Sequence, residues 1–201
     1  MSKTLAIVGA GPGLGLSLAR RFATAGFEIV LISRDPSKLD FDARKVAADV
    51  TDHEGLAAAL HSIGPIDVLE YSPTPTFGLV EPKDLTPEAV LAPFQHQVLG
   101  AIAAVNATEL RPGGALLFTT AASSITPVPM TANVGIAMAA LRAYAKTLHL
   151  ALAPDTYVGH LAIDMFMQGD DADTAAAALY DLYAARTDFE VKVGNFLETL
   201  T

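Results

Sequence analysis

The first residues that could do chemistry form a glycine-rich segment near the start of the chain, Ala6-Ile-Val-Gly-Ala-Gly-Pro-Gly-Leu-Gly15. Glycine has no side chain, so such a loop lets its backbone approach a ligand closely. A helix that begins directly after the loop presents free N–H groups and a positive dipole end to an anion. The spacing therefore predicts a phosphate-binding loop, with contacts from Gly9, Gly11, Pro12, Gly13, Leu14 and Gly15. The alternative is a tight turn in which glycine serves packing alone.

A second candidate site follows the next apolar segment. In dinucleotide-binding folds an acidic residue about 20 residues after the loop holds the ribose 2′-hydroxyl of NAD. This chain has Ser33-Arg34 there. A guanidinium can bind a phosphate through two parallel hydrogen bonds, so this pair favours the 2′-phosphate of NADP(H) over NAD(H). In the alternative interpretation, Arg34 is a surface residue paired with Asp35 or Asp40.

Further along, Asp49-Val50 follows a third, weaker apolar segment. A carboxylate at this place can accept a hydrogen bond from an adenine amino group. It can equally serve, beside Asp52, as an acid at the start of the next helix, where negative charge is favourable. Both interpretations of Asp49 remain open from the sequence.

Two more groups of residues lie where ligands bind in open α/β sheets, beyond the carboxyl ends of strands. Tyr71-Ser72 ends the fourth strand-like segment, and Ser123 follows the fifth, with Thr120 and Ser124 nearby. Tyr71 is a candidate proton donor or a wall of the nicotinamide pocket, and Ser72 is a candidate cofactor contact. Ser123 is a candidate catalytic hydroxyl.

Strand-like and helix-like segments alternate along the chain and position these residues. Short apolar runs predict strands at 4–9, 27–32, 44–48, 66–71, 115–120 and 157–163, with an edge strand at 189–193. Helical spacing and capping residues predict helices at 14–26, 52–62, 86–110, 132–152 and 171–186. Strands that are apolar throughout and alternate with helices indicate a parallel sheet covered on both faces. We expect one α/β domain, a doubly wound Rossmann-like sheet over residues 1–201.

Composition excludes several classes of function. Hydrophobic residues make up 51% of the 201 residues, charged residues make up 17%, and the net charge is −9. Nucleic-acid binding and attachment to anionic membranes both require a basic surface, so neither is expected. The chain has no cysteine, and its five histidines have no spacing typical of a metal site. The mean hydropathy is +0.37, but no apolar run is long enough to span a bilayer. We expect a cytoplasmic protein.

The chain resembles the short-chain dehydrogenase/reductase family over nearly its whole length. The likeness rests on Gly9-x-x-x-Gly13-x-Gly15, Ser33-Arg34, Asp49-Val50 and the order of the elements. It implies a sheet with strand order 3-2-1-4-5-6-7 and an oxidoreductase that uses NAD(P) on alcohols or carbonyls. It also implies a homodimer or homotetramer that pairs through helices 86–110 and 132–152.

The chain departs from the family at its catalytic pair. Members carry Tyr-x-x-x-Lys, in which the lysine lowers the pKa of the tyrosine that donates the proton. Here Val134 and Met138 fall at those two positions, and no tyrosine has a lysine four residues later. The resemblance therefore implies an atypical member. One hypothesis is an NADP(H)-dependent oxidoreductase with a non-standard proton relay. The other is a non-catalytic NADP(H)-binding sensor or partner subunit, and a third, weaker idea is another small nucleotide in the same crevice.

Overall fold

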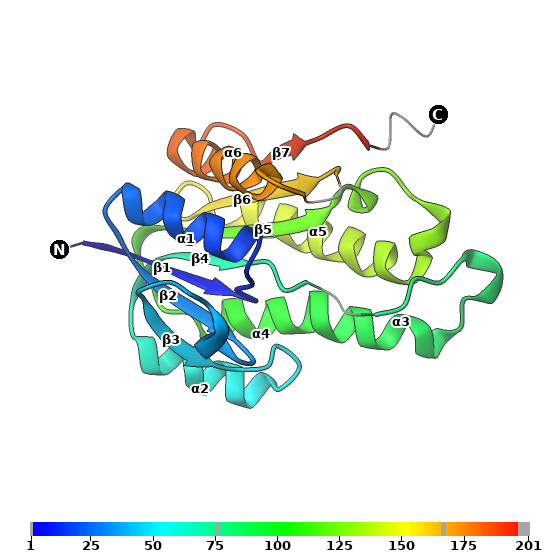
Figure 1. Ribbon diagram of the computed structural model, residues 1–201, viewed down its shortest axis with the longest axis horizontal. Helices are drawn as coiled ribbons and strands as arrows, with labels where there is room; N and C mark the ends of the chain where they lie inside the picture. Colours follow the sequence, from blue (N-terminus) through cyan, green and yellow to red (C-terminus); the bar gives the residue numbers. More distant parts are fainter. Residues whose placement is uncertain (1, 75–76, 166–167, 197–201) are drawn as a thin grey trace.

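A parallel sheet forms the centre of the molecule (Figure 1). The computed structural model describes residues 2–74, 77–165 and 168–196. The strands are β1 Lys3–Val8, β2 Phe27–Ser33, β3 Arg44–Ala47, β4 Ile66–Tyr71, β5 Leu110–Ala121, β6 Tyr157–Ile163 and β7 Glu190–Val193. They lie in the order β3-β2-β1-β4-β5-β6-β7, and each neighbouring pair is parallel. The predicted strand order and the α/β class are confirmed.

Helices cover both faces of this sheet (Figure 1). Helix α1 Leu14–Thr24 and helix α6 Asp171–Ala185 pack on one face. Helices α2 His53–Ile63, α4 Gly100–Ala107 and α5 Ala132–Leu152 pack on the other, where α3 Pro87–Phe94 contacts α5. In the described part of the chain, none of these helices has the length and apolar character needed to cross a membrane.

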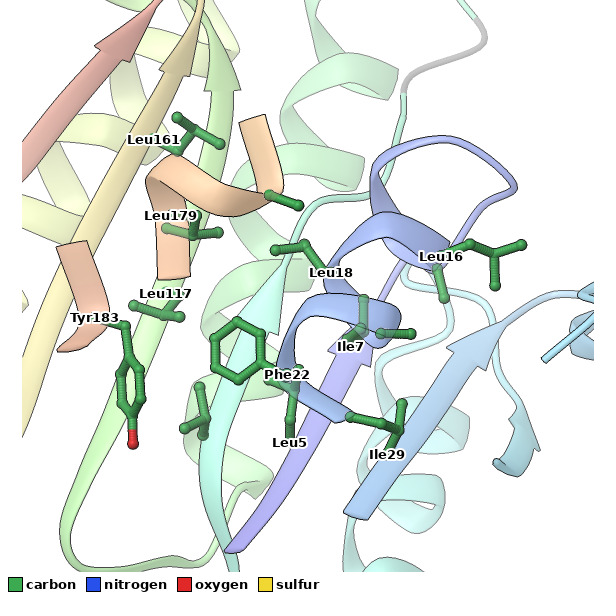
Figure 2. Packing of buried hydrophobic residues seen from close by; sticks show 14 of the residues in the cluster. Leu5, Ile7, Leu16, Leu18, Phe22, Ile29, Leu117, Leu161, Leu179 and Tyr183 are labelled. Atoms are coloured by element: carbon green, nitrogen blue, oxygen red, sulfur yellow. The ribbon is translucent and has the colours of Figure 1, made fainter. Parts of the chain in front are cut away.

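The core explains why the strands are apolar throughout. Leu5 and Ile7 point from β1 toward α1 and α6, whereas Ala6 and Val8 point toward the opposite helices. Figure 2 shows the first of these two layers, in which Phe22 of α1 lies over the sheet among aliphatic side chains. Fully burying a side chain of this size contributes about 1.5–3 kcal/mol to stability. Because successive residues of a strand are buried on opposite faces of the sheet, the strands are apolar at nearly every position, which accounts for the high mean hydropathy.

The predicted helix 86–110 and strand 115–120 are wrong in their bounds. The helical segment is divided into α3, a π-helical turn Gln95–Leu99 and α4, and it ends at Ala107. Thr108 ends it with an extended backbone, and β5 begins at Leu110, opposite Ile66 of β4. The register of β5 against β4 shifts between Ile66 and Val68, and Gly113 of β5 has φ +75°. The other predicted elements agree within one or two residues.

Candidate functional site

The glycine-rich loop has the open geometry that a phosphate cradle requires. It joins β1 to α1 at the carboxyl edge of the sheet. A Cβ added at Gly11 or Gly13 would meet no atom of the described residues within 4 Å, so these residues leave the space above the loop open. Gly13 is the N-cap of α1 and provides no side-chain cap. Among the described residues, the N–H of Leu16 in the first helical turn already donates to the Gly11 carbonyl at 3.0 Å, which leaves those of Leu14 and Gly15 available to an anion.

The other two glycines of the loop are needed for packing. Gly9 has φ +86°, and a Cβ there would lie 2.3 Å from the Cα of Pro73. A Cβ on Gly15 would lie 2.9 Å from the Cα of Ala10. Gly9 thus holds the loop against the segment after β4, and Gly15 lets α1 approach the loop. Pro12 of the loop is exposed, and Leu14 at the start of α1 is partly exposed. Packing and an open phosphate cradle coexist in one loop.

Arg34 follows β2 directly and its side chain is exposed. Among the residues that the structure describes, it forms no ion pair within 4 Å, because Asp35 pairs with Lys38 at 2.9 Å instead. The alternative pairing of Arg34 with Asp35 or Asp40 is therefore absent. Ser33 lies beside it at the end of β2, and the Ser33 carbonyl accepts from the backbone N–H of Ala48. The exposed guanidinium therefore lies at the carboxyl end of β2.

Asp49 lies in the loop between β3 and α2. Its Oδ1 accepts from the backbone N–H and the hydroxyl of Thr51, at 2.9 and 2.8 Å. These bonds, aided by the charge of Arg34, lower the pKa of Asp49 below its ordinary value. The N-cap of α2 is Asp52, which accepts from Gly55 N–H at 3.0 Å. Asp49 is therefore not the helix cap, and Val50 beside it is buried.

Tyr71 does not lie where a proton donor must lie. Its side chain is fully buried, and its hydroxyl donates to the carbonyl oxygen of His96 at 2.5 Å. A Cβ on Gly100 would lie within 2.4 Å of the same hydroxyl oxygen, so α4 covers it closely. Burial raises the pKa of Tyr71 far above its ordinary value. The phenol points into the core beneath α4, which argues against both the donor and the pocket-wall interpretations.

Ser72 takes part in a buried polar group on the α1 side of the sheet. Its hydroxyl donates to Glu70 Oε2 at 2.8 Å, and Thr119 donates to Glu70 Oε1 at 3.0 Å. Glu70 is fully buried, and this desolvation raises its pKa to about 8. The carboxyl is therefore protonated at neutral pH. This acid was missed from the sequence because it stands within an apolar strand.

The hydroxyls after β5 and the apolar pair of α5 meet at one place. Ser123 lies in the turn Ala122–Ser124 and is partly exposed. Val134 and Met138 are both buried on α5, and the Met138 sulfur accepts from the backbone N–H of Ala121 at 3.1 Å. These two side chains cannot move a proton. The end of β5 is therefore lined by hydroxyls on one side and by apolar groups on the other.

Three buried amide and imidazole side chains near this edge were not predicted as site residues. Gln97, 1% exposed, donates to the carbonyl of Pro73 at 3.0 Å and fixes the segment after β4. Asn133 of α5 bridges Val80 N–H and the Gly78 carbonyl. The available signal for Asn133 was a polar residue at the start of a mainly apolar helix, whereas Gln97 follows Gln95 and His96 and does not stand out. His160 of β6 is 0% exposed and bonds to Thr120 of β5 at 2.9 Å.

Two hollows lie at the opposite, amino edge of the sheet. They measure about 500 and 570 Å³, and residues of β1, β2 and their flanking loops line both. No residue of the glycine-rich loop lines either one. No cluster of three or more metal-ligating side chains occurs among the described residues. The chemistry-bearing residues therefore gather at the carboxyl edge.

Comparison with known proteins places this arrangement in a family. The family model "short chain dehydrogenase" matches residues 3–165. The chain belongs to the short-chain dehydrogenase family. A solved short-chain dehydrogenase from Rhodopseudomonas palustris superimposes with a TM-score of 0.81 at 22% identity, over 96% of this chain and 98% of that one. One from Burkholderia cenocepacia J2315, solved in complex with NADP, superimposes with a TM-score of 0.83 at 18% identity, over 99% and 91%.

Sequence similarity to curated members of the family is confined to part of the chain. Galactitol 2-dehydrogenase (L-tagatose-forming) of Cereibacter sphaeroides is 36% identical over 75 residues. That match covers 32% of this chain and only 30% of the relative. The chain thus matches less than a third of the length of this relative, and the likeness to the solved structures concerns the fold.

Proposed function

We propose that this short-chain dehydrogenase is an NADP(H)-dependent oxidoreductase that acts on a small carbonyl or alcohol substrate. The observation that carries the proposal is the combination of an open glycine-rich loop with Arg34 after β2, which forms no ion pair with any residue that the structure describes. NADP-bound relatives of the same fold support the choice of cofactor. NAD(H) would gain nothing from the guanidinium, because it lacks the 2′-phosphate.

Different residues at the carboxyl edge of the sheet would bind different parts of NADP(H). The backbone of Gly11, Gly13 and Leu14 would hold the pyrophosphate, since their N–H groups lie at the start of α1. Ser33 and Arg34 would hold the 2′-phosphate through charge-assisted hydrogen bonds. The carboxylate of Asp49 keeps an oxygen, Oδ2, outside its bonds to Thr51 and could accept from the adenine amino group. When bound, the nicotinamide supplies or accepts a hydride.

The proton step in this proposal differs from the Tyr-x-x-x-Lys relay. Val134 and Met138 carry no titratable group, and the Tyr71 phenol is buried with its hydroxyl already engaged. Hydroxyls after β5 remain, with Ser123 partly exposed at the sheet edge. A hydroxyl positioned at the substrate oxygen can donate a hydrogen bond and pass a proton if a base lies behind it.

The test of this function is a titration followed by turnover. Purified protein is titrated with NADPH and NADH by fluorescence, and then mixed with NADPH and a panel of small aldehydes and ketones. We expect saturable NADPH binding and consumption of NADPH with at least one carbonyl compound. Absence of NADPH binding would contradict the cofactor assignment. NADPH binding without turnover on any compound would contradict the enzymatic role and favour a sensor or partner subunit.

We also propose that the protein forms a homodimer or homotetramer through the two long helical segments at 86–110 and 132–152. Large apolar side chains are exposed on them, including Leu91 of α3 at 60% and Ile136 of α5 at 46%. The two helices pack against each other, so these side chains belong to one helical layer. A second copy of the same layer would cover them.

A further inference from the structure

A continuous chain of polar side chains runs across the α5 face of the sheet, beside the hydroxyls of the proposed site. Thr120 Oγ1 lies 2.8 Å from Ser124 Oγ and 2.9 Å from His160 Nε2. The other ring nitrogen, His160 Nδ1, lies 2.9 Å from Glu190 Oε2. These residues come from β5, the turn after it, β6 and β7, which are neighbours in the sheet (Figure 1). A hydroxyl, an imidazole and a carboxylate therefore lie in hydrogen-bond sequence.

Arg142 of α5 fixes the direction of these hydrogen bonds. Its Nε and Nη2 donate to the two carboxylate oxygens of Glu190, at 2.5 and 3.0 Å. Hydrogen bonds from Arg142 and the neighbouring His160 hold the pKa of Glu190 below its ordinary value despite partial burial, so Glu190 is a carboxylate. It must accept from His160 Nδ1–H, which leaves Nε2 as an acceptor. Thr120 then donates to Nε2, and Ser124 donates to Thr120.

The members of this chain differ in solvent exposure, and the chain links the turn after β5 to the outermost strand, β7. Ser124 is 8% exposed, Thr120 3% and His160 0%, whereas the Glu190 side chain is 23% exposed. Ser124 lies at the carboxyl edge of the sheet, in the turn that follows β5 and packs against α5. Glu190 lies on the outermost strand, β7. The buried imidazole thus joins the proposed site to the solvent at the sheet edge.

The groups around His160 keep its imidazole neutral, so that the ring can take up a proton and release it again. Burial lowers the pKa of His160 to about 4 although Glu190 opposes this shift. The charged groups that face the ring are Glu190 from β7 and Arg142 from α5. The ring of Phe189 stacks on it at 5.8 Å, and His149 and Lys146 of α5 contact that ring rather than His160. A buried neutral imidazole accepts a proton only transiently, as a relay must.

We propose that Ser124, Thr120 and His160 form the proton path of this enzyme, with Glu190 and Arg142 as positioning residues. The proposal rests on the oxidoreductase function proposed above. Ser124 is the catalytic residue, because it lies in the turn beyond the carboxyl end of β5, where the substrate is proposed to bind. Thr120 and His160 act through it.

Proton transfer along this path balances in both directions. When bound, the oxidised cofactor would supply the hydride acceptor for the carbon of an alcohol substrate, and the hydroxyl proton of that alcohol passes to Ser124 Oγ. The Ser124 proton passes to Thr120 Oγ1, and the Thr120 proton passes to His160 Nε2. His160 then releases its Nδ1 proton through Glu190 to water. Reduction of a carbonyl runs these transfers in reverse, with one proton taken up from water.

Matched variants on one strand test this path. Thr120→Val removes the linking hydroxyl with little change of shape, and Thr120→Ser keeps it. Ser124→Ala breaks the path in the turn, where folding is least affected. Thr119→Val is the control, because the Thr119 hydroxyl bonds to Glu70 on the other face of the sheet. Each variant is first checked for its melting temperature and its NADPH dissociation constant.

The first readout is the ¹⁵N NMR spectrum of the histidines in protein saturated with NADPH. We expect His160 as the Nδ1–H tautomer at pH 7, with an Nε2 resonance that moves in Thr120→Val and stays in Thr119→Val. The second readout is turnover of NADPH with the carbonyl panel. We expect Thr120→Val and Ser124→Ala to lose roughly a hundredfold in kcat, with Thr120→Ser close to wild type. The variant that combines Thr120→Val with Ser124→Ala should have a kcat no lower than that of the slower single variant, because both changes break the same path.

Three results would overturn the proposal. An Nε2–H tautomer would reverse the hydrogen bonds on which it rests. A kcat of Thr120→Val or Ser124→Ala within twofold of an active wild type would remove the path while leaving the oxidoreductase function intact. A wild type that binds NADPH but turns over no compound would overturn the oxidoreductase function and the path together.

Discussion

Gly9 and Pro73 are in direct backbone contact, since a Cβ on residue 9 would lie 2.3 Å from the Pro73 Cα. Gly9 also adopts φ +86°, a conformation that residues with a Cβ rarely adopt. The contact joins the loop after β1 to the segment after β4, the two segments that flank the site. By contrast, nothing lies within 4 Å of a Cβ on Gly13. The two glycines therefore serve different ends and can be separated by mutation.

We expect Gly9→Ala to destabilise the fold and Gly13→Ala to spare it. Gly9→Ala combines an unfavourable φ with a clash against backbone, which costs roughly 1–3 kcal/mol or more. Gly13→Ala places a methyl group in the open space proposed for the pyrophosphate. It should keep the melting temperature near that of the wild type and weaken NADPH binding. Thermal unfolding and NADPH titration of both variants check this contrast, and normal NADPH affinity in Gly13→Ala would contradict the cradle.

Arg34→Asp should abolish the preference for NADPH. The variant replaces a phosphate ligand with a repelling carboxylate that can instead accept from a ribose 2′-hydroxyl. We expect the NADPH dissociation constant to rise roughly tenfold or more, with NADH binding unchanged or tighter. Lys38→Ala is the matched control, because Lys38 pairs with Asp35. Equal losses of NADPH affinity in the two variants would show a general charge effect rather than a specific contact.

Glu70 should make the protein less stable as the pH rises. Burial raises its pKa from 4.5 to about 8, so between these values the folded protein holds a proton that the unfolded chain releases. The unfolding free energy therefore falls by about 1.4 kcal/mol per pH unit in this interval. Glu70→Gln carries no such penalty, so its melting temperature relative to wild type should rise between pH 5 and pH 8. The exposed Glu28→Gln should follow the wild type, and parallel curves for Glu70→Gln would contradict the buried neutral acid.

An oligomer built on α3, α4 and α5 should dissociate when charge is placed on its face. We expect more than one copy per particle by light scattering of the wild type at micromolar concentration. Ile136→Lys should shift the protein toward a monomer, because a lysine would be buried without a partner. The same change at the exposed Thr24 of α1, on the opposite face, should leave the assembly intact. A monomeric wild type would contradict the proposal.

The sequence predicted the scaffold better than the site. Runs such as 4–9 and 66–71 are buried on both faces, and their mainly apolar pattern, together with the helical segments that alternate with them, indicated parallel strands. The break in helix 86–110 was missed although Pro93, a residue type that interrupts helices, stands two residues before the π-helical turn. Tyr71 was misplaced since strand register decides which face a side chain occupies.

The polar side chains that were missed form hydrogen bonds between residues that lie far apart in the sequence. Thr120 and His160 lie forty residues apart in the sequence, and Glu190 lies thirty residues further on. Their hydrogen bonds exist only because β5, β6 and β7 are adjacent in the sheet. Local spacing carries no sign of such a chain. A lone histidine in an apolar strand was the one available signal.

Binding of NADPH and NADH to the unmodified protein tests the central claim most directly. Both cofactors are titrated by fluorescence at the same ionic strength, because the 2′-phosphate contact is screened by salt. The free guanidinium of Arg34 and the open cradle at Gly11 and Gly13 predict that NADPH binds at least about tenfold more tightly than NADH. Equal affinities, or no binding of either cofactor, would contradict the account.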